Sequence, residues 1–278
     1  MQHHPSYRAI VLLFLLAAGI PSVITGQQKD SLDLLRLFMN AARTYQQVPL
    51  QVNMDLRNHT NLVLAKEDTS HIQAEFYRDD TGGYIKLGEM EQIVNDSMAL
   101  IVSNELKRMI IYKDAQAVAA QMRSMMAPSL PDSSILRLAA RYTVTAEKVS
   151  DRIGQLNLFS RMKLPGTTLS GEEMAMDYQQ APLQPVKIRM LKRSLIPVQP
   201  EDSVAATKQY GQAGQLIHIE GEGLFIIREQ VSEFVFTKIT HDKSVRIPVL
   251  ITDRIMKNEE GNYIPTKDYA SFLMTQNF

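Results

Sequence analysis

The chain has 278 residues, with 30 Lys and Arg against 30 Asp and Glu, 45% hydrophobic residues, no Cys and no Trp. A net formal charge of zero provides no positive field for binding a phosphate backbone, which argues against a nucleic-acid partner. The absence of Cys excludes disulfides, thiolate nucleophiles, Fe–S clusters and Cys-based zinc sites. The hydrophobic share is typical of a globular protein rather than a disordered one.

Residues 1–26 have the pattern of a cleaved secretory signal peptide. Arg8 is their only charged residue, and the apolar run 9–20 is too short to cross about 30 Å of hydrocarbon. Cleavage is expected directly before or after Gly26, and the alternative is a buried N-terminal helix. Because no Cys stands at the cut, the protein is not expected to be a lipoprotein. The mature chain, 27–278, is expected to be soluble and either periplasmic or secreted.

The mature chain is predicted to begin with an amphipathic helix over 30–43, in which apolar residues recur at helical spacing. An antiparallel meander is predicted over 52–112, where segments of alternating apolar and polar residues are separated by short turns. One of these turns contains the paired glycines Gly82 and Gly83, which tolerate positive φ. The alternation favours a sheet with one apolar face.

A second helix is predicted over 115–126 and ends before Pro128. Its apolar face is rich in Met, a flexible side chain that fills irregular space or contacts a variable ligand. Packing in the core is the alternative role for this face. Strand patterns return at 142–159, at 186–190 and at 216–239.

A seven-residue segment, 45–51, recurs as 178–184 with one residue changed. Each copy directly precedes an alternating strand. Duplication of a half-sheet and coincidence both explain the repeat. The mature chain is therefore interpreted as a single β-rich domain over 27–278 or as two half-sheets, 27–134 and 135–278.

No catalytic or metal-binding motif is present in the sequence. His218 and Glu220 supply only two of the three or four ligands that a metal site needs. Ser160 and Lys163 have the spacing of a Ser-x-x-Lys motif, but the flanking residues favour strands and the companion motifs are missing. No enzymatic activity, cofactor or metal is therefore expected.

Two pairs of carboxylates, Glu89 with Glu91 and Glu172 with Glu173, are candidates for acid–base chemistry. The sequence does not determine the distance within either pair. Solvated surface side chains are the favoured interpretation.

The segments 76–78, 82–87, 95–97 and 107–112 are similar to the early strands of the periplasmic lipoprotein carriers, the LolA-like superfamily. The order of signal peptide, helix, meander, helix and further strands resembles that family too, and also exported proteins of Bacteroidetes-type bacteria. The resemblance implies an α+β fold. It implies a strongly curved antiparallel half-barrel sheet with helices packed across its concave side.

The resemblance also implies a non-enzymatic periplasmic carrier that binds a lipid, acyl chain or lipoprotein on a concave apolar face. Each buried CH₂ contributes about 0.8 kcal/mol, so such binding needs no polar catalyst. The residues expected to line the face, with plain core packing as the alternative for each, are Phe76, Leu87, Ile101, Met109, Ile111, Met122 and Met126. The alternative function is a structural or accessory envelope protein that acts through a protein–protein interface.

Overall fold

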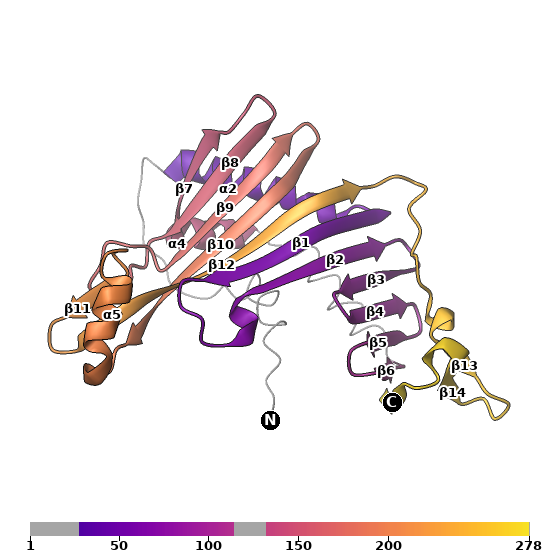
Figure 1. The fold of residues 1–278 in the computed structure, drawn as a ribbon. Coiled ribbons are helices and arrows are strands. Elements are labelled where there is room, and N and C mark those ends of the chain that lie inside the picture. Colours follow the sequence, from indigo (N-terminus) through magenta and orange to yellow (C-terminus); the bar gives the residue numbers. More distant parts are fainter. Residues whose placement is uncertain (1–27, 114–131, 278) are drawn as a thin grey trace. The chain divides into compact units, whose positions relative to one another are not determined.

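The structure, a computed structural model, describes residues 28–113 and 132–277 (Figure 1). The predicted signal peptide and the predicted helix over 115–126 lie outside the described residues, and so do Met122 and Met126.

The described residues form an α+β fold with three α-helices and a large, mostly antiparallel sheet. The helices are α2 (Gln28–Ala42), α4 (Asp132–Arg141) and α5 (Ser203–Tyr210). The strands are β1 (Leu50–Thr60), β2 (Ser70–Arg78), β3 (Gly82–Leu87), β4 (Met90–Asn95), β5 (Ala99–Ser103), β6 (Arg108–Tyr112), β7 (Tyr142–Lys148), β8 (Ile153–Ser160), β9 (Glu172–Gln180), β10 (Leu183–Pro197), β11 (Leu216–Ile219), β12 (Gly223–Thr240), β13 (Ile255–Lys257), β14 (Tyr263–Pro265) and β15 (Leu273–Asn277).

The main sheet has 13 strands in the order β15-β6-β5-β4-β3-β2-β1-β12-β10-β9-β8-β7, with β11 paired to β12. Strands β1 to β6 lie side by side in chain order, which confirms the meander predicted over 52–112 (Figure 1). The C-terminal strand β15 pairs with β6 in parallel, and β13 and β14 form a separate hairpin.

The chain divides into two compact units, each built from three segments. Of the described residues, unit 1 contains 28–41, 57–71 and 132–234, and unit 2 contains 42–56, 72–113 and 235–277. Strands β1, β2 and β12 therefore contribute residues to both units. The single domain and the duplication considered above both remain predictions.

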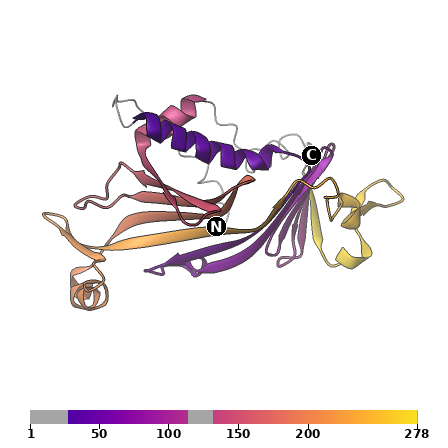
Figure 2. The ribbon, with the colours of Figure 1, turned by 90° about the horizontal axis from the view of Figure 1, so that it is seen from above.

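Unit 1 buries the apolar face of α2 against strands β7 to β9. Leu35 and Met39, one helical turn apart, pack with Leu156 and Met176 in a single cluster, which we call cluster 1. Helices α2 and α4 lie on the same side of these strands (Figure 2). The amphipathic helix predicted over 30–43 is confirmed.

Unit 2 contains strands β3 to β6 with an apolar cluster on each face. Register places Phe76, Ile85, Val94 and Ala99 on one side, which we call face A. The opposite side, which we call face B, carries a second apolar cluster. Its residues on these strands are Tyr84, Ile93, Leu100, Val102, Met109 and Ile111. A strand alternates its side chains between two faces, so this pattern means that both faces of the sheet are apolar here.

The two copies of the repeated segment adopt different structures. The first lies in a 3-10 helix, η1 (Arg43–Gln46), and leads into β1, whereas the second ends β9 and leads into β10. The peptide bonds before Pro49 and Pro182 are both cis.

Candidate functional site

Five of the residues expected to line an apolar ligand face lie in the described part of the chain, and the structure places them on two different faces of the sheet. Phe76 on β2, Leu87 on β3 and Ile101 on β5 lie on face A. Met109 and Ile111 lie on face B, where they pair with Val102 and Leu100 and are 0% and 1% exposed. Two of the five therefore point away from the other three.

The residue of β6 that does lie on face A is Ile110, which pairs directly with Ile101. Leu87, Ile101 and Ile110 are all half-buried. Sequence reasoning missed Ile110 because the run Met109, Ile110, Ile111 is continuously apolar. Only the register with β5 shows that Ile110 shares face A with Ile101, whereas Met109 and Ile111 lie on face B.

Face B is filled by a later part of the same chain. Ile251 and Ile255 are buried in its cluster, and further half-buried apolar residues pack against it. These residues are Tyr77, Met98, Ile247, Val249, Tyr263, Tyr269, Phe272 and Met274. The segment 247–272 thus closes face B from solvent.

A buried ion pair attaches this segment to the sheet. Glu91 on β4 is only 5% exposed, and its Oε2 accepts hydrogen bonds from Nε and Nη2 of Arg254 at 3.2 and 2.9 Å. Its Oε1 accepts one from Asn104 Nδ2 at 2.8 Å. The Arg254 guanidinium lies over the ring of Tyr269, 4.8 Å from its centroid. The solvated state expected for Glu91 is therefore wrong.

Tyr84 is buried on the same face as this ion pair. Burial, and secondarily the neighbouring carboxylate of Glu91, raise the pKa of the Tyr84 hydroxyl well above its usual range. This hydroxyl is therefore neutral at any physiological pH.

Tyr45 of η1 presents its hydroxyl to the interior of unit 2. Its ring packs against the apolar cluster of face A and lies 5.9 Å from the ring of Phe236. The hydroxyl oxygen is buried and has no hydrogen-bond partner among the described residues. Burial raises the pKa of this hydroxyl well above its usual value, so it stays a neutral donor.

His241 holds the segment that carries Tyr45. Its Nδ1 lies 3.1 Å from the carbonyl oxygen of Pro49, and its Nε2 lies 3.0 Å from Oγ1 of Thr44. A carbonyl oxygen only accepts, so Nδ1 donates to Pro49, and the Thr44 hydroxyl, which can donate or accept, bonds to Nε2. These two bonds connect both ends of the turn before β1.

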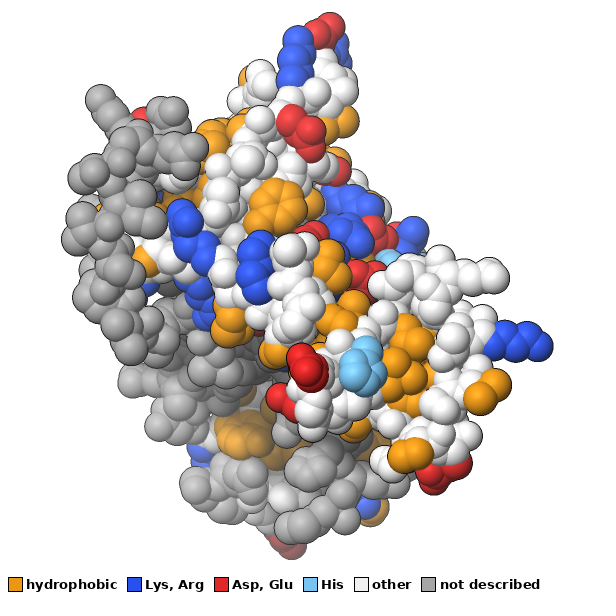
Figure 3. All heavy atoms as spheres, turned by 90° about the vertical axis from the view of Figure 1, so that its left-hand side faces the viewer, with side chains coloured by type: hydrophobic (Ala, Val, Ile, Leu, Met, Phe, Trp, Pro, Cys, Tyr) orange, Lys and Arg blue, Asp and Glu red, His pale blue; other side chains and the backbone are white. Residues whose placement is uncertain are grey.

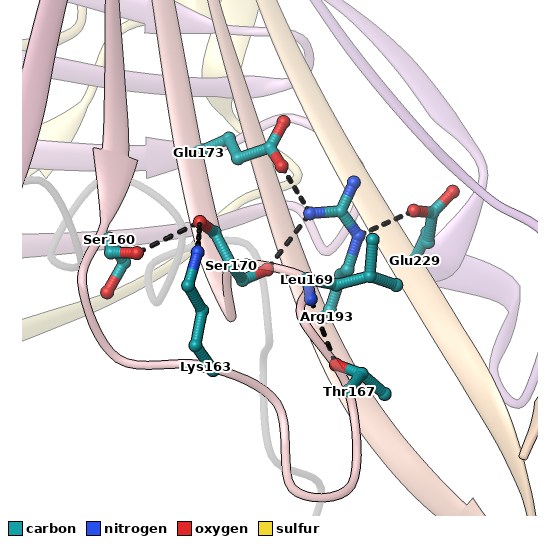
Figure 4. A network of polar contacts seen from close by, with 8 residues as sticks. All are labelled: Ser160, Lys163, Thr167, Leu169, Ser170, Glu173, Arg193 and Glu229. Carbon is teal, nitrogen blue, oxygen red and sulfur yellow. Dashed lines mark hydrogen bonds and ion pairs between the residues drawn. The ribbon is translucent and has the colours of Figure 1, made fainter.

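In unit 1, Arg193 forms the centre of a polar network (Figure 4). Its side chain is 10% exposed, its Nε donates to Glu229 at 2.7 Å, and its Nη1 donates to the carbonyl oxygen of Ser170 at 2.9 Å and to Glu173. Arg193 on β10 thus joins β9 and β12. By connecting three strands in this way, these contacts have a structural role.

The Ser-x-x-Lys spacing forms no nucleophile–base pair. Lys163 Nζ lies 3.4 Å from the hydroxyl of Ser170 rather than that of Ser160 (Figure 4). The Ser170 hydroxyl itself donates to the carbonyl oxygen of Ser160 at 2.9 Å. Ser160 is 1% exposed, and its hydroxyl accepts from the Met162 N–H at 3.2 Å.

The carboxylates of Glu172 and Glu173 do not form a pair either. As neighbours on β9 they point to opposite faces of the sheet. Glu172 accepts from Arg141 at 3.0 Å and from the Tyr142 hydroxyl at 3.1 Å, whereas Glu173 pairs with Arg193. Both carboxylates are engaged in structural contacts rather than free in solvent.

Within 28–113 and 132–277, no group of three His, Asp or Glu side chains is arranged to hold a metal ion. His218 and Glu220 are both exposed. None of the helices in this part of the chain is long and apolar enough to cross a membrane.

Three solved structures are similar to this chain. A LolA superfamily protein from Nitrosomonas europaea is 9% identical, with 77% of this chain and 94% of that chain covered and a TM-score of 0.26. A domain described as an outer membrane lipoprotein-sorting protein, from Vibrio parahaemolyticus, is 9% identical, with 79% and 95% covered and a TM-score of 0.25. A DUF1329 family protein from Desulfovibrio piger is 12% identical, with 80% and 96% covered and a TM-score of 0.26.

No protein-family model and no curated protein sequence matches the chain. In structure the chain is similar to a LolA superfamily protein and to a lipoprotein-sorting protein domain.

Proposed function

We propose that this protein is a non-enzymatic carrier in the bacterial periplasm and that it binds an apolar ligand on face A of unit 2. The ligand class is a lipid, an acyl chain or the acylated end of a lipoprotein. In this proposal the sheet is strongly curved as a half-barrel, with helices across its concave side, and the protein reaches the periplasm by cleavage of the signal peptide 1–26.

The observation that carries the proposal is the difference between the two faces of β3 to β6. Face B is packed by the chain's own segment 247–272. On face A, by contrast, the half-buried Leu87 packs against the cluster that contains the buried Phe76. The half-buried Ile101 and Ile110 form a neighbouring pair on β5 and β6, separated from Phe76 by Ile85 and Gln92. An acyl chain of sixteen carbons that lost most of its contact with water here would gain on the order of 10 kcal/mol before the costs of ordering it.

The proposed lining combines Phe76, Leu87 and Ile101 with Ile110. Met122 and Met126 are proposed to contribute from the predicted helix 115–126. Met109 and Ile111 are left out of the lining because they are buried on the other face.

The experiment is native mass spectrometry of the mature chain, 27–278, purified from a periplasmic extract, with lipid analysis of the same sample. A bound mass of lipid size that is lost on solvent extraction supports a carrier. N-terminal sequencing of that sample tests the cleavage site. A clean unliganded mass, together with no binding of an added apolar probe, would contradict the proposal.

A pair of variants locates the ligand. Ile101→Arg places a charge on face A and is expected to lower probe affinity at least tenfold, because burying an unpaired charge is costly. Leu106→Arg is the matched control, since Leu106 is 54% exposed in the turn between β5 and β6. Equal affinities for both variants and the natural protein would place the ligand elsewhere.

The alternative function is a structural or accessory envelope protein that acts through a protein interface. The observation in its favour is a set of exposed apolar side chains in unit 1, namely Val63, Leu64, Met162 and Val204, the last of them 81% exposed. On the side shown in Figure 3, however, hydrophobic side chains lie in small groups among charged and other side chains. Small separate groups are ordinary for a protein surface, so the carrier is favoured.

A further inference from the structure

The buried hydroxyl of Tyr45 is unusual in its surroundings. The cluster of face A, against which Tyr45 packs, is made entirely of apolar and aromatic side chains, and the hydroxyl has no partner among the described residues. Buried polar groups in native proteins nearly always have hydrogen-bond partners, and an exception calls for an explanation.

The position of the hydroxyl is determined by contacts at both ends of its segment. Thr44, the preceding residue, is bonded to His241, which is also bonded to Pro49 at the start of β1. The ring of Tyr45 in addition packs against Phe236. These contacts restrain the tyrosine, so its hydroxyl stays directed into the cluster rather than turning toward water.

The surroundings also select the kind of acceptor. The side chains that pack around the Tyr45 ring are apolar, and the tyrosine hydroxyl itself carries no charge that would neutralise a carboxylate or phosphate. Burying such an anion in an apolar environment without a cation is strongly unfavourable. A neutral carbonyl oxygen needs no counter-charge and accepts a hydrogen bond from a tyrosine hydroxyl.

We propose that the ligand bound on face A carries a neutral acyl carbonyl, as an ester or amide, and that this oxygen accepts a hydrogen bond from the Tyr45 hydroxyl. This inference rests on the proposed carrier function and narrows its ligand from apolar molecules in general to acyl esters and amides. Tyr45 then acts as a selectivity residue that distinguishes an acylated group from a plain hydrocarbon.

The test compares two fluorescent probes that differ only in the acceptor. One is the methyl ester of pyrenedecanoic acid, and the other is decylpyrene, which has no carbonyl. Each is titrated into the mature natural protein and into Tyr45→Phe. The expected result is an about three- to tenfold loss of affinity for the ester with Tyr45→Phe, and a change of less than about twofold for decylpyrene.

Tyr84→Phe is the matched control, because Tyr84 is a buried tyrosine of the same unit on face B. It is expected to leave the ratio of the two affinities unchanged. Tyr45→Phe should also melt, without probe, at the same or a higher temperature than the natural protein, because it removes an unpaired buried hydroxyl.

Three results would overturn the inference. These are unchanged ester binding by Tyr45→Phe, an equal loss for both probes, and a lower melting temperature that shows the hydroxyl to be paired, for example to water, in the free protein. If neither probe binds the natural protein, the carrier function itself fails, and this result is distinct from the other three.

Discussion

Arg254 and Glu91 lie 163 positions apart in the chain and form a buried ion pair, in which two guanidinium nitrogens contact one carboxylate oxygen at 3.2 and 2.9 Å. Their side chains are 16% and 5% exposed. The pair attaches the segment 247–272, which packs on face B, to β4.

Removal of this cation should destabilise the protein strongly. Arg254→Met leaves the Glu91 carboxylate buried without its charge partner, at an expected cost of about 3–5 kcal/mol in the free energy of unfolding. Urea denaturation followed by circular dichroism measures this cost. Glu91→Gln in the same chain should recover much of the loss, and Arg108→Met, at an exposed position of β6, serves as control. A loss as small as that of the control would contradict a structural role for the pair.

Arg193 should behave similarly in unit 1, with a specific suppressor. Arg193→Met leaves Glu173 and Glu229 without the cation between them and should lower the free energy of unfolding by about 3 kcal/mol or more. Adding Glu173→Gln removes one of the two negative charges and should restore part of it. Lys192→Met, at the exposed neighbouring position, is expected to change stability by less than about 0.5 kcal/mol. Failure of the suppressor would argue against repulsion between the two carboxylates.

Asp68 should make stability depend on pH in the acid range. Burial alone would raise its pKa, but the N–H groups of Leu64 and Ala65 at 2.7 and 2.9 Å and the guanidinium of Arg228 at 2.6 Å outweigh burial and lower that pKa. Because the folded pKa lies below the unfolded value of about 3.9, the stabilisation is fully present above that pH and is lost as pH falls through the folded pKa.

Asp68→Asn isolates this contribution. The variant should be less stable than the natural protein at pH 7, by about 1–3 kcal/mol, and the difference should shrink below about pH 4. Urea denaturation at a series of pH values measures both. A difference that stays constant down to pH 2 would show that the carboxylate charge is not the cause.

Gly154 on β8 should not tolerate a side chain. It pairs directly with Tyr178, and a Cβ at this position would lie 2.5 Å from the Tyr178 ring. Gly154→Ala should therefore cost about 1–3 kcal/mol through displacement of a ring that is packed in cluster 1. Gly171→Ala is the control, since its Cβ would meet only an ordinary contact of 3.6 Å. Thermal denaturation that shows equal melting temperatures for the two variants would contradict this account.

Local patterns predicted the fold well where one face of an element is buried. The helical spacing of Leu35 and Met39 and the alternation in β1 and β2 come from burial on one side, and these elements formed as expected. In β3 to β6 the expectation of one apolar face was wrong, because apolar side chains are buried on both faces there. Pairing between distant segments was not predictable in the same way. Strand β15 pairs in parallel with β6, although the two strands are at least 160 residues apart in the chain. The sequence of Leu273–Asn277 carries no local signal for this pairing.

The candidate site was predicted only in part, for the same reason. Phe76 and Leu87 share face A and stand in segments of alternating pattern, but the continuous apolar runs around Ile101 and from Met109 to Ile111 hide the side to which each residue points. The buried state of Glu91 was missed because its partner, Arg254, comes from a distant segment. Nothing local to Tyr45 indicates that its hydroxyl is buried.

By itself, the sequence determined the class of the protein: an α+β chain without cysteine chemistry, with an amphipathic helix, a meander and a resemblance to LolA-like carriers. The lack of cysteine is a matter of composition, and the helix and the meander follow from short-range periodicity, which each segment carries independently. The α+β class is what the resemblance implied. Only the tertiary structure decided that 247–272 covers face B, that Ile110 joins Ile101 on face A, and that the Tyr45 hydroxyl is buried without a partner. Register and long-range packing determine these three features, because each depends on residues that are far apart in the chain.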